Sequence, residues 1–129
     1  MSTIVVGWSP DSYGRAAVDH AVAESRLRDA KLVIVNATRG DSLVDEGYAG
    51  KDELAQLESD LAGTGVAFEV RQSMGADVAD QVLEVAEDVD ATLVVVGIRR
   101  RSPMGKLIMG SVAQRVILGA ACPVLAVKP

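Results

Sequence analysis

Residues 92–112 read TLVVVGIRRRSPMGKLIMGSV, a passage from an apolar run through a cationic loop to the start of a helix. The run at 92–96 is rich in valine, which is typical of a strand buried on both faces. The residues between Gly97 and Gly110 include glycines, a proline and polar side chains, and they predict a loop. Beyond it, apolar residues recur at helical spacing and form the expected buried face: Val112, Ala113, Val116, Ile117 and Ala120.

The same alternation extends in both directions from this segment. Strands are expected at residues 3–6, 32–35, 66–70, 92–96 and 123–127. Between them, apolar residues three and four positions apart predict amphipathic helices, with Asp11 and Asp77 placed to cap two of them. This order predicts an α/β fold: a doubly wound, five-stranded parallel sheet with right-handed crossovers, formed by residues 1–129 as a single domain.

Composition excludes several classes of function. The chain has 13 Lys and Arg against 18 Asp and Glu, a net charge of -5, whereas a nucleic-acid-binding domain is normally basic. Its one cysteine, Cys122, and one histidine, His20, leave no intramolecular disulfide and none of the usual Cys/His zinc sites. The apolar runs are too short to span a membrane. We therefore expect a soluble cytoplasmic protein without nucleic-acid, membrane or metal partners.

A doubly wound sheet binds ligands at the carboxyl ends of its strands, which directs attention to the loops after the first and fourth strands. The fourth loop carries the cations Arg99, Arg100, Arg101 and Lys106. It ends at Gly110 and Ser111, where the unpaired amides of a helix start favour an anion. Two interpretations stay open: a phosphate cradle, or a solvated cationic rim beside a helix that Ser111 merely caps.

The common nucleotide motifs are absent. No glycine precedes Gly105–Lys106 at the P-loop spacing, and the dinucleotide fingerprint Gly-x-Gly-x-x-Gly does not occur. The sequence also specifies no nucleophile and no matched acid and base. We expect a binding module rather than an enzyme, with ATP hydrolysis at most weak.

A different spacing is present. Gly97, Arg100 and Gly110–Ser111 follow the pattern Gly-x2-Gly-x9-Gly-Ser/Thr with arginine at the second position, and Val112 continues it. In this pattern the chain resembles the universal stress protein family over essentially its whole length. The resemblance implies a flavodoxin-like (adenine nucleotide alpha hydrolase-like) sheet of strand order 3-2-1-4-5. It also implies a homodimer through the C-terminal strand.

In one branch of that family an adenine nucleotide, ATP or AMP, lies across the first and fourth loops, with Mg²⁺ accompanying ATP. Carried over to this chain, the phosphates would lie against Gly97, Gly110, Ser111 and Val112, assisted by Arg100 or Arg101. The base and ribose would lie against Gly7, Ser9 and Ala37. Trp8, at the end of the first strand, could stack on a base or pack beneath the neighbouring loop.

Two departures leave the ligand open. Ser9 stands where nucleotide-binding relatives usually have aspartate, and Arg100 replaces a glycine. Asp11 follows closely, but helix capping is its favoured role. The first hypothesis is a nucleotide-binding stress-response module. The alternative is a dimeric module of the same family that binds no nucleotide and acts through protein contacts.

Overall fold

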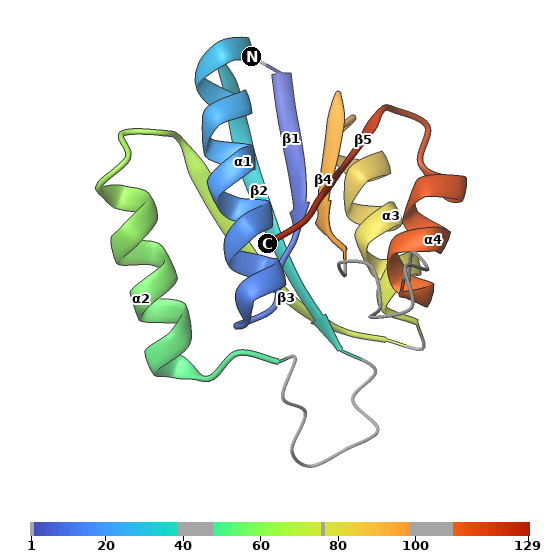
Figure 1. The fold of residues 1–129 in the computed structure, drawn as a ribbon, viewed down its shortest axis with the longest axis horizontal. Coiled ribbons are helices and arrows are strands. Elements are labelled where there is room, and N and C mark those ends of the chain that lie inside the picture. The colour runs from blue at the N-terminus through green and yellow to red at the C-terminus, as the bar shows by residue number, and fades with distance from the viewer. Residues whose placement is uncertain (1, 39–47, 76, 99–109) are drawn as a thin grey trace.

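The computed structural model describes residues 2–38, 48–75, 77–98 and 110–129. Strands and helices alternate along these residues, as predicted (Figure 1). The strands are β1 (Ser2–Gly7), β2 (Ala30–Thr38), β3 (Phe68–Met74), β4 (Leu93–Gly97) and β5 (Val124–Val127). The helices are α1 (Ser12–Arg28), α2 (Lys51–Ala62), α3 (Val78–Asp88) and α4 (Ser111–Gly119).

The strands form one parallel sheet in the order β3-β2-β1-β4-β5, which confirms both the predicted fold class and the strand order. Helices α1 and α2 cover one face, and α3 and α4 cover the other (Figure 1). Alternate residues of β1 serve the two faces: Ile4 and Val6 pack with α1 and α2, whereas Val5 packs with α3 and α4. A strand buried on both faces needs consecutive apolar side chains, and this explains the unbroken run.

The centre of the sheet is the main hydrophobic core. Each of Ile4, Val6, Ile34 and Val95 is fully buried. Burial of one such side chain stabilises the fold by about 1.5–3 kcal/mol. The structure confirms the strands predicted at these positions. Apolar side chains in consecutive positions suit the interior of a sheet.

Strand β3 begins and ends later than the predicted 66–70. It lies at an edge of the sheet, where part of each side chain reaches solvent, so an apolar run is not required. Charged pairs replace it: Arg71 Nε lies 2.7 Å and Lys31 Nζ 3.3 Å from the carboxylate of Glu69. The hydrogen bond from Arg71 first, and that from Lys31 second, lower the pKa of Glu69 below its ordinary value.

Buried polar groups tie the carboxyl end of the sheet together. Asn36 on β2 is fully buried; its Nδ2 donates to the carbonyl of Trp8 at 3.0 Å, and its Oδ1 accepts from the amide of Ala49 at 2.8 Å. On the other face, Gln81 of α3 donates from Nε2 to the carbonyl of Thr38 at 3.0 Å. These bonds anchor Ala49, which leads into α2, and the first turns of α3 to β2.

The predicted buried face of α4 is partly wrong. Ala113 and Val116 are buried, but Val112 is 40% exposed and Ile117 37% exposed, and Ala120 lies just beyond the helix as its C-cap. Helix α4 packs against α3 and the edge strand β5. Only a narrow stripe of its surface is therefore covered. Among the described residues, no helix combines the length and apolar character needed to cross a membrane.

Candidate functional site

A cavity of about 390 Å³ lies at the carboxyl ends of β1 and β4. These strands are neighbours, with Gly7 paired to Val96, yet β1 leads to α1 on one face and β4 precedes α4 on the other. Divergence of the two connections leaves a crevice at the switch point of the sheet. The lining residues come from the first turns of α1, α3 and α4 and from the ends of the central strands: Gly7, Trp8, Ser9, Asp11, Tyr13, Gly14, Val35, Ala37, Val78, Val82, Val96, Gly97, Ile98, Gly110, Val112 and Ala113.

Most of the predicted site residues meet here. Those that line the cavity are Gly7, Ser9, Ala37, Gly97, Gly110 and Val112. Ser111 is exposed and is not part of the lining. Arg100 and Arg101 lie outside the described residues, so their proposed contacts with phosphate stay predictions.

The interpretation of Ser111 as the helix cap is wrong. Gly110 is the N-cap of α4, with an extended backbone (φ -65°, ψ 153°), and Ser111 is already the first helical residue. Among the described residues, no side chain caps this end. The first amides of a helix have no partner within it, so this N-terminus presents unpaired donors beside Val112 and Ala113, which line the cavity.

The motif glycines have different roles. A Cβ on Gly97 would lie 2.5 Å from the carbonyl oxygen of Tyr13, so glycine is required there for α1 to pack against β4. A Cβ on Gly110 would have no atom of the residues described by the structure within 4 Å, its chain neighbours aside. The protein's own packing therefore explains glycine at position 97 and does not explain it at position 110. Open space at the start of a helix is what a ligand approaching its amides would need.

Asp11 caps α1, as predicted. Its Oδ1 accepts from the amide of Gly14 at 2.9 Å, and its Oδ2 accepts from the Ser9 hydroxyl at 2.8 Å. The capping aspartate nonetheless lines the cavity, which the sequence-based interpretation did not foresee. Ser9 and Asp11 thus form one hydrogen-bonded unit at the edge of the cavity.

Trp8 lies between two cavities. It packs against the core beneath α1 and α2 and borders the switch-point cavity as well as a second one between those helices. Its amide donates to the carbonyl of Val35 at 2.9 Å. The sequence left two roles open for Trp8: stacking on a base, or packing beneath the neighbouring loop. In the structure one side of Trp8 packs against the core, and another side borders the switch-point cavity.

The cavity combines apolar walls with polar donors. Val35, Val82 and Val96 supply apolar surface, and Asp11 is the one charged residue among the described lining. Flat apolar groups fit such walls, and an anionic group fits the N-terminus of α4. The described residues contain no cluster of three or more His, Cys, Asp or Glu able to hold a metal ion.

Sequence reasoning missed Tyr13 and Gly14. A Cβ on Gly14 would lie 1.8 Å from the carbonyl oxygen of Ser9 and 2.8 Å from Trp8 Cδ1, so α1 approaches the loop after β1 as closely as a glycine permits. A glycine in the first turn of an otherwise regular amphipathic helix was an available signal of such an approach. The α3 residues Val78 and Val82 also line the cavity, and nothing in their helical spacing indicated a cavity wall.

Comparisons with known proteins agree with the architecture. The model of the universal stress protein family matches residues 1–128. A universal stress protein of Mycolicibacterium smegmatis is 49% identical over 126 residues, covering 98% of this chain and 97% of the relative. The structure of a universal stress protein from Archaeoglobus fulgidus superimposes with a TM-score of 0.81 at 32% identity, over 99% of this chain and 98% of that chain. A universal stress protein solved in complex with cAMP has a TM-score of 0.73 at 28% identity, over 98% and 96% of the two chains.

Proposed function

The chain belongs to the universal stress protein family, and we propose that it is a cytoplasmic regulatory module that binds an adenine nucleotide in the switch-point cavity. The observation that carries the proposal is the start of α4, where a helix N-terminus without a side-chain cap adjoins a glycine with open space around it. Both features lie at the wall of one cavity. The relative solved with cAMP supports the same class of ligand.

Each part of the cavity suits one part of a nucleotide. The phosphate would lie at the α4 amides next to Gly110 and Val112, where the helix dipole favours negative charge. The base would lie between apolar walls that include Ala37 and Val35. Ser9 and Asp11 offer acceptor oxygens to the ribose hydroxyls.

Arg100 and Arg101 would add positive charge to the phosphate end. With Asp11 as the one described carboxylate of the lining, AMP needs no metal to bind. For ATP, Mg²⁺ would arrive with the triphosphate. Gly97 also shapes the cavity by admitting Tyr13, and its contact with phosphate stays part of the proposal.

Calorimetric titration of AMP, ATP and cAMP into protein freed of bound nucleotide tests the proposal. We expect saturable binding and thermal stabilisation, since a ligand at 100 times its dissociation constant adds about 2.7 kcal/mol to the free energy of unfolding. Gly110→Val should weaken binding at least tenfold, because its side chain would fill the open space beside the helix amides. Gly50→Val is the matched control: Gly50 is also an extended helix N-cap with room around it, but it lies outside the cavity.

The absence of heat and of stabilisation at millimolar nucleotide would contradict nucleotide binding. Equal weakening by Gly110→Val and Gly50→Val would place the ligand elsewhere. Either result would favour the alternative hypothesis, a module that acts through protein contacts alone.

We also propose that two copies pair through β5. This strand is an edge of the sheet, bonded to β4 on one side. Its Pro123 and Val127 carbonyls accept from the β4 side, at 3.0 Å from Val94 N and 2.7 Å from Ile98 N. In a parallel pair alternate residues face the same neighbour, so the backbone groups of Ala126 face the open edge.

Sedimentation velocity tests this pairing. The unmodified chain should sediment as a dimer, and Ala126→Pro should give monomers, since proline removes an outward amide without breaking a bond to β4. Ala126→Val keeps that amide and should remain dimeric. A monomeric unmodified chain, or a dimeric proline variant, would contradict pairing through β5.

A further inference from the structure

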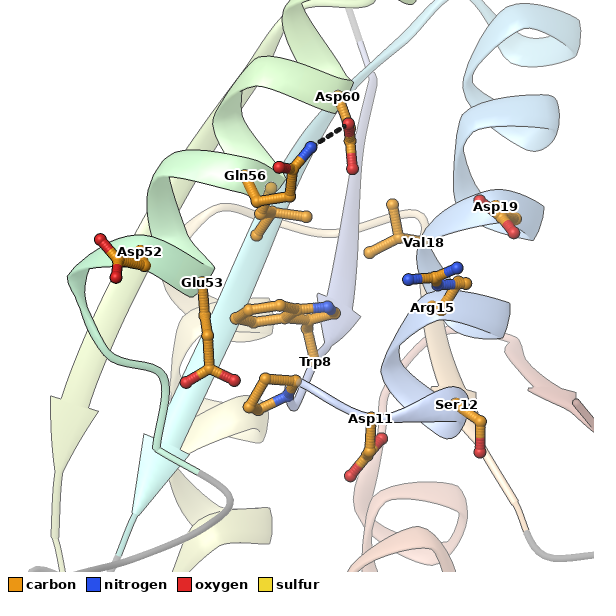
Figure 2. A pocket seen from close by; sticks show the side chains of 12 residues that line it. Trp8, Asp11, Ser12, Arg15, Val18, Asp19, Asp52, Glu53, Gln56 and Asp60 are labelled. Carbon is orange, nitrogen blue, oxygen red and sulfur yellow. Dashed lines mark hydrogen bonds between the residues drawn. The ribbon is translucent and has the colours of Figure 1, made fainter.

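The second cavity, a groove of about 650 Å³ between α1 and α2, lies on the sheet face opposite α3 and α4 (Figure 2). Its size is within the range of small-molecule sites in proteins. The described residues that line it come from the loop after β1 and from the facing sides of the two helices. It is a separate site from the switch-point cavity, with which it shares only Trp8 and Asp11.

The floor of the groove is apolar. The Trp8 indole lies between the two helices, with Val18 of α1 beside it (Figure 2). Leu57 of α2 completes the floor, and it and Val18 are at least nine-tenths buried. An occupant therefore needs an apolar body that can cover these side chains.

The rim of the groove is acidic. Its carboxylates are Asp11, Asp19, Asp52, Glu53 and Asp60, and among the described lining residues the one cationic side chain is Arg15. Asp11 and Glu53 are engaged as helix caps, accepting from the amides of Gly14 and Gly50, and Asp60 accepts from Gln56 Nε2 at 2.8 Å.

Two carboxylates are left without compensation. Asp19 and Asp52 form no ion pair or hydrogen bond with the described residues, and Arg15 likewise forms no ion pair there. The groove consequently carries an excess of negative charge in its unliganded form. An anionic ligand is disfavoured, and a cationic one is complementary.

The arrangement of the charges narrows the ligand further. Asp19 lies on the α1 wall, whereas Asp52 and Asp60 lie on the opposite α2 wall, with Trp8 between them (Figure 2). The carboxylates do not converge on one point, and no metal-binding cluster exists among the described residues. Separated charges over an apolar floor match a molecule that carries several ammonium groups joined by methylene segments. An ammonium placed over the indole would gain a cation–π interaction.

We propose that this groove binds an aliphatic polyamine, with its methylene chain against Trp8, Val18 and Leu57 and its ammonium groups at Asp19 on one wall and Asp52 and Asp60 on the other. Arg15 opposes this binding because it lies on the α1 wall with like charge. The polyamine site is independent of nucleotide binding in the other cavity.

Spermidine is the probe, and Trp8 is a built-in reporter because it is the only tryptophan in the chain. Titration should change Trp8 fluorescence saturably and release heat in calorimetry. Tetraethylene glycol, a neutral chain of similar length, should produce neither signal at the same concentration. Butylamine, with one charge, should bind more weakly than spermidine.

Paired variants distinguish binding of spermidine in the groove from nonspecific attraction of a cation to an acidic protein. Asp19→Asn combined with Asp52→Asn should weaken spermidine binding about tenfold, since each exposed charge contact contributes only modestly. Glu87→Gln combined with Asp88→Asn is the control of equal charge on α3, outside both cavities, and should leave the affinity within about twofold. Arg15→Gln should tighten binding, an effect that loss of folding cannot imitate.

Absence of saturable spermidine binding at millimolar concentration would overturn the proposal. Equal weakening of spermidine binding by the Asp19/Asp52 and the Glu87/Asp88 double variants would also overturn it, by showing that only net charge matters. So would binding of an arginine-rich peptide with no binding of spermidine, which would identify the groove as a protein-docking surface. Unchanged AMP affinity in the Asp19/Asp52 double variant is expected, because those residues line only the groove.

Discussion

The switch-point cavity and the α1–α2 groove share Trp8 and Asp11 but offer opposite electrostatic environments. The cavity is closed by the N-terminus of α4, whose unpaired amides favour an anion. The groove is formed by the sides of two helices, and carboxylate side chains on those sides favour a cation. Within one small acidic protein, local geometry rather than net charge therefore determines the charge of the ligand that we propose for each site.

The two sites also depend on different supports. The bonds of Asn36 hold Trp8, which borders both sites, and Ala49, which leads into α2, a wall of the groove alone. The bonds of Gln81 hold α3 against β2, and α3 is a wall of the cavity alone. Substitutions of Asn36 and of Gln81 should therefore affect the ligand affinities of the two sites differently. A substitution that alters the loop after β1, which both sites share, should weaken binding at both.

Gly14→Ala should have the largest effect, because it alters the loop that both sites share. The new Cβ would lie 1.8 Å from the Ser9 carbonyl oxygen, so the loop or α1 must move. We expect a loss of about 3 kcal/mol in the free energy of unfolding, measured by urea denaturation, together with weaker binding of both AMP and spermidine. Gly110→Ala, where space is open, should cost about 1 kcal/mol or less. Equal stability of the two variants would contradict the close approach at Gly14.

Asn36→Ala should come next. It leaves the Ala49 amide and the Trp8 carbonyl without this partner. Each buried polar group that loses its hydrogen bond lowers the free energy of unfolding by about 1–3 kcal/mol. We expect a total loss of about 3 kcal/mol in urea denaturation. Spermidine affinity should fall more than AMP affinity, because Ala49 leads into α2. A larger fall in AMP affinity than in spermidine affinity would contradict the claim that Asn36 mainly supports the groove.

Gln81→Ala is the counterpart on the other face. It removes the bond to the Thr38 carbonyl and the acceptor for the Ser73 hydroxyl, which donates at 2.6 Å. We expect a loss of about 2 kcal/mol and a fall in AMP affinity with spermidine affinity nearly unchanged, measured by calorimetry. Parallel losses for both ligands would show that the two sites are not separable.

Glu69→Gln should have the smallest effect and should spare both sites. The pKa of Glu69 is lowered by Arg71 and Lys31, so its ion pairs stabilise the fold above the ordinary value of 4.5. That contribution is lost as the pH falls through the lower folded-state pKa. Because the side chain is about two-fifths exposed, the contribution is below about 1 kcal/mol. Urea denaturation at pH 7 should show the small difference between variant and parent, and the difference should shrink as the pH is lowered below 4.5; a difference that grew there would contradict the pKa direction.

Much of the fold could be predicted because its signals are local. The valine run of β4 suits only a buried strand, and the capping roles of Asp11 and Asp77 follow from residue type and position; the side chains accept from Gly14 and Asp80 as such caps should. The switch point then follows from the alternation of strands and helices. A cavity lies at the switch point, with Gly7 and Gly110 in its lining, and the binding role of these residues stays a prediction.

The rest depends on packing between distant segments. Asn36 reads as a polar break in an apolar strand until the Trp8 carbonyl and the Ala49 amide meet it. The carboxylates Asp19 and Asp52 lie far apart in sequence and line one groove only because α1 and α2 lie on the same face of the sheet. Ser111 was misread because serine is a common N-cap, whereas here the extended backbone ends one residue earlier, at Gly110.

The most direct test of nucleotide binding at the switch point is an amide chemical-shift map recorded during titration of AMP into ¹⁵N-labelled, nucleotide-free protein. The largest shifts should fall at Gly7, Gly97, Gly110 and Val112 around the cavity, while Asp52 and Gln56 of α2 stay unchanged. No shifts at millimolar AMP, or shifts confined to α1 and α2, would contradict the account.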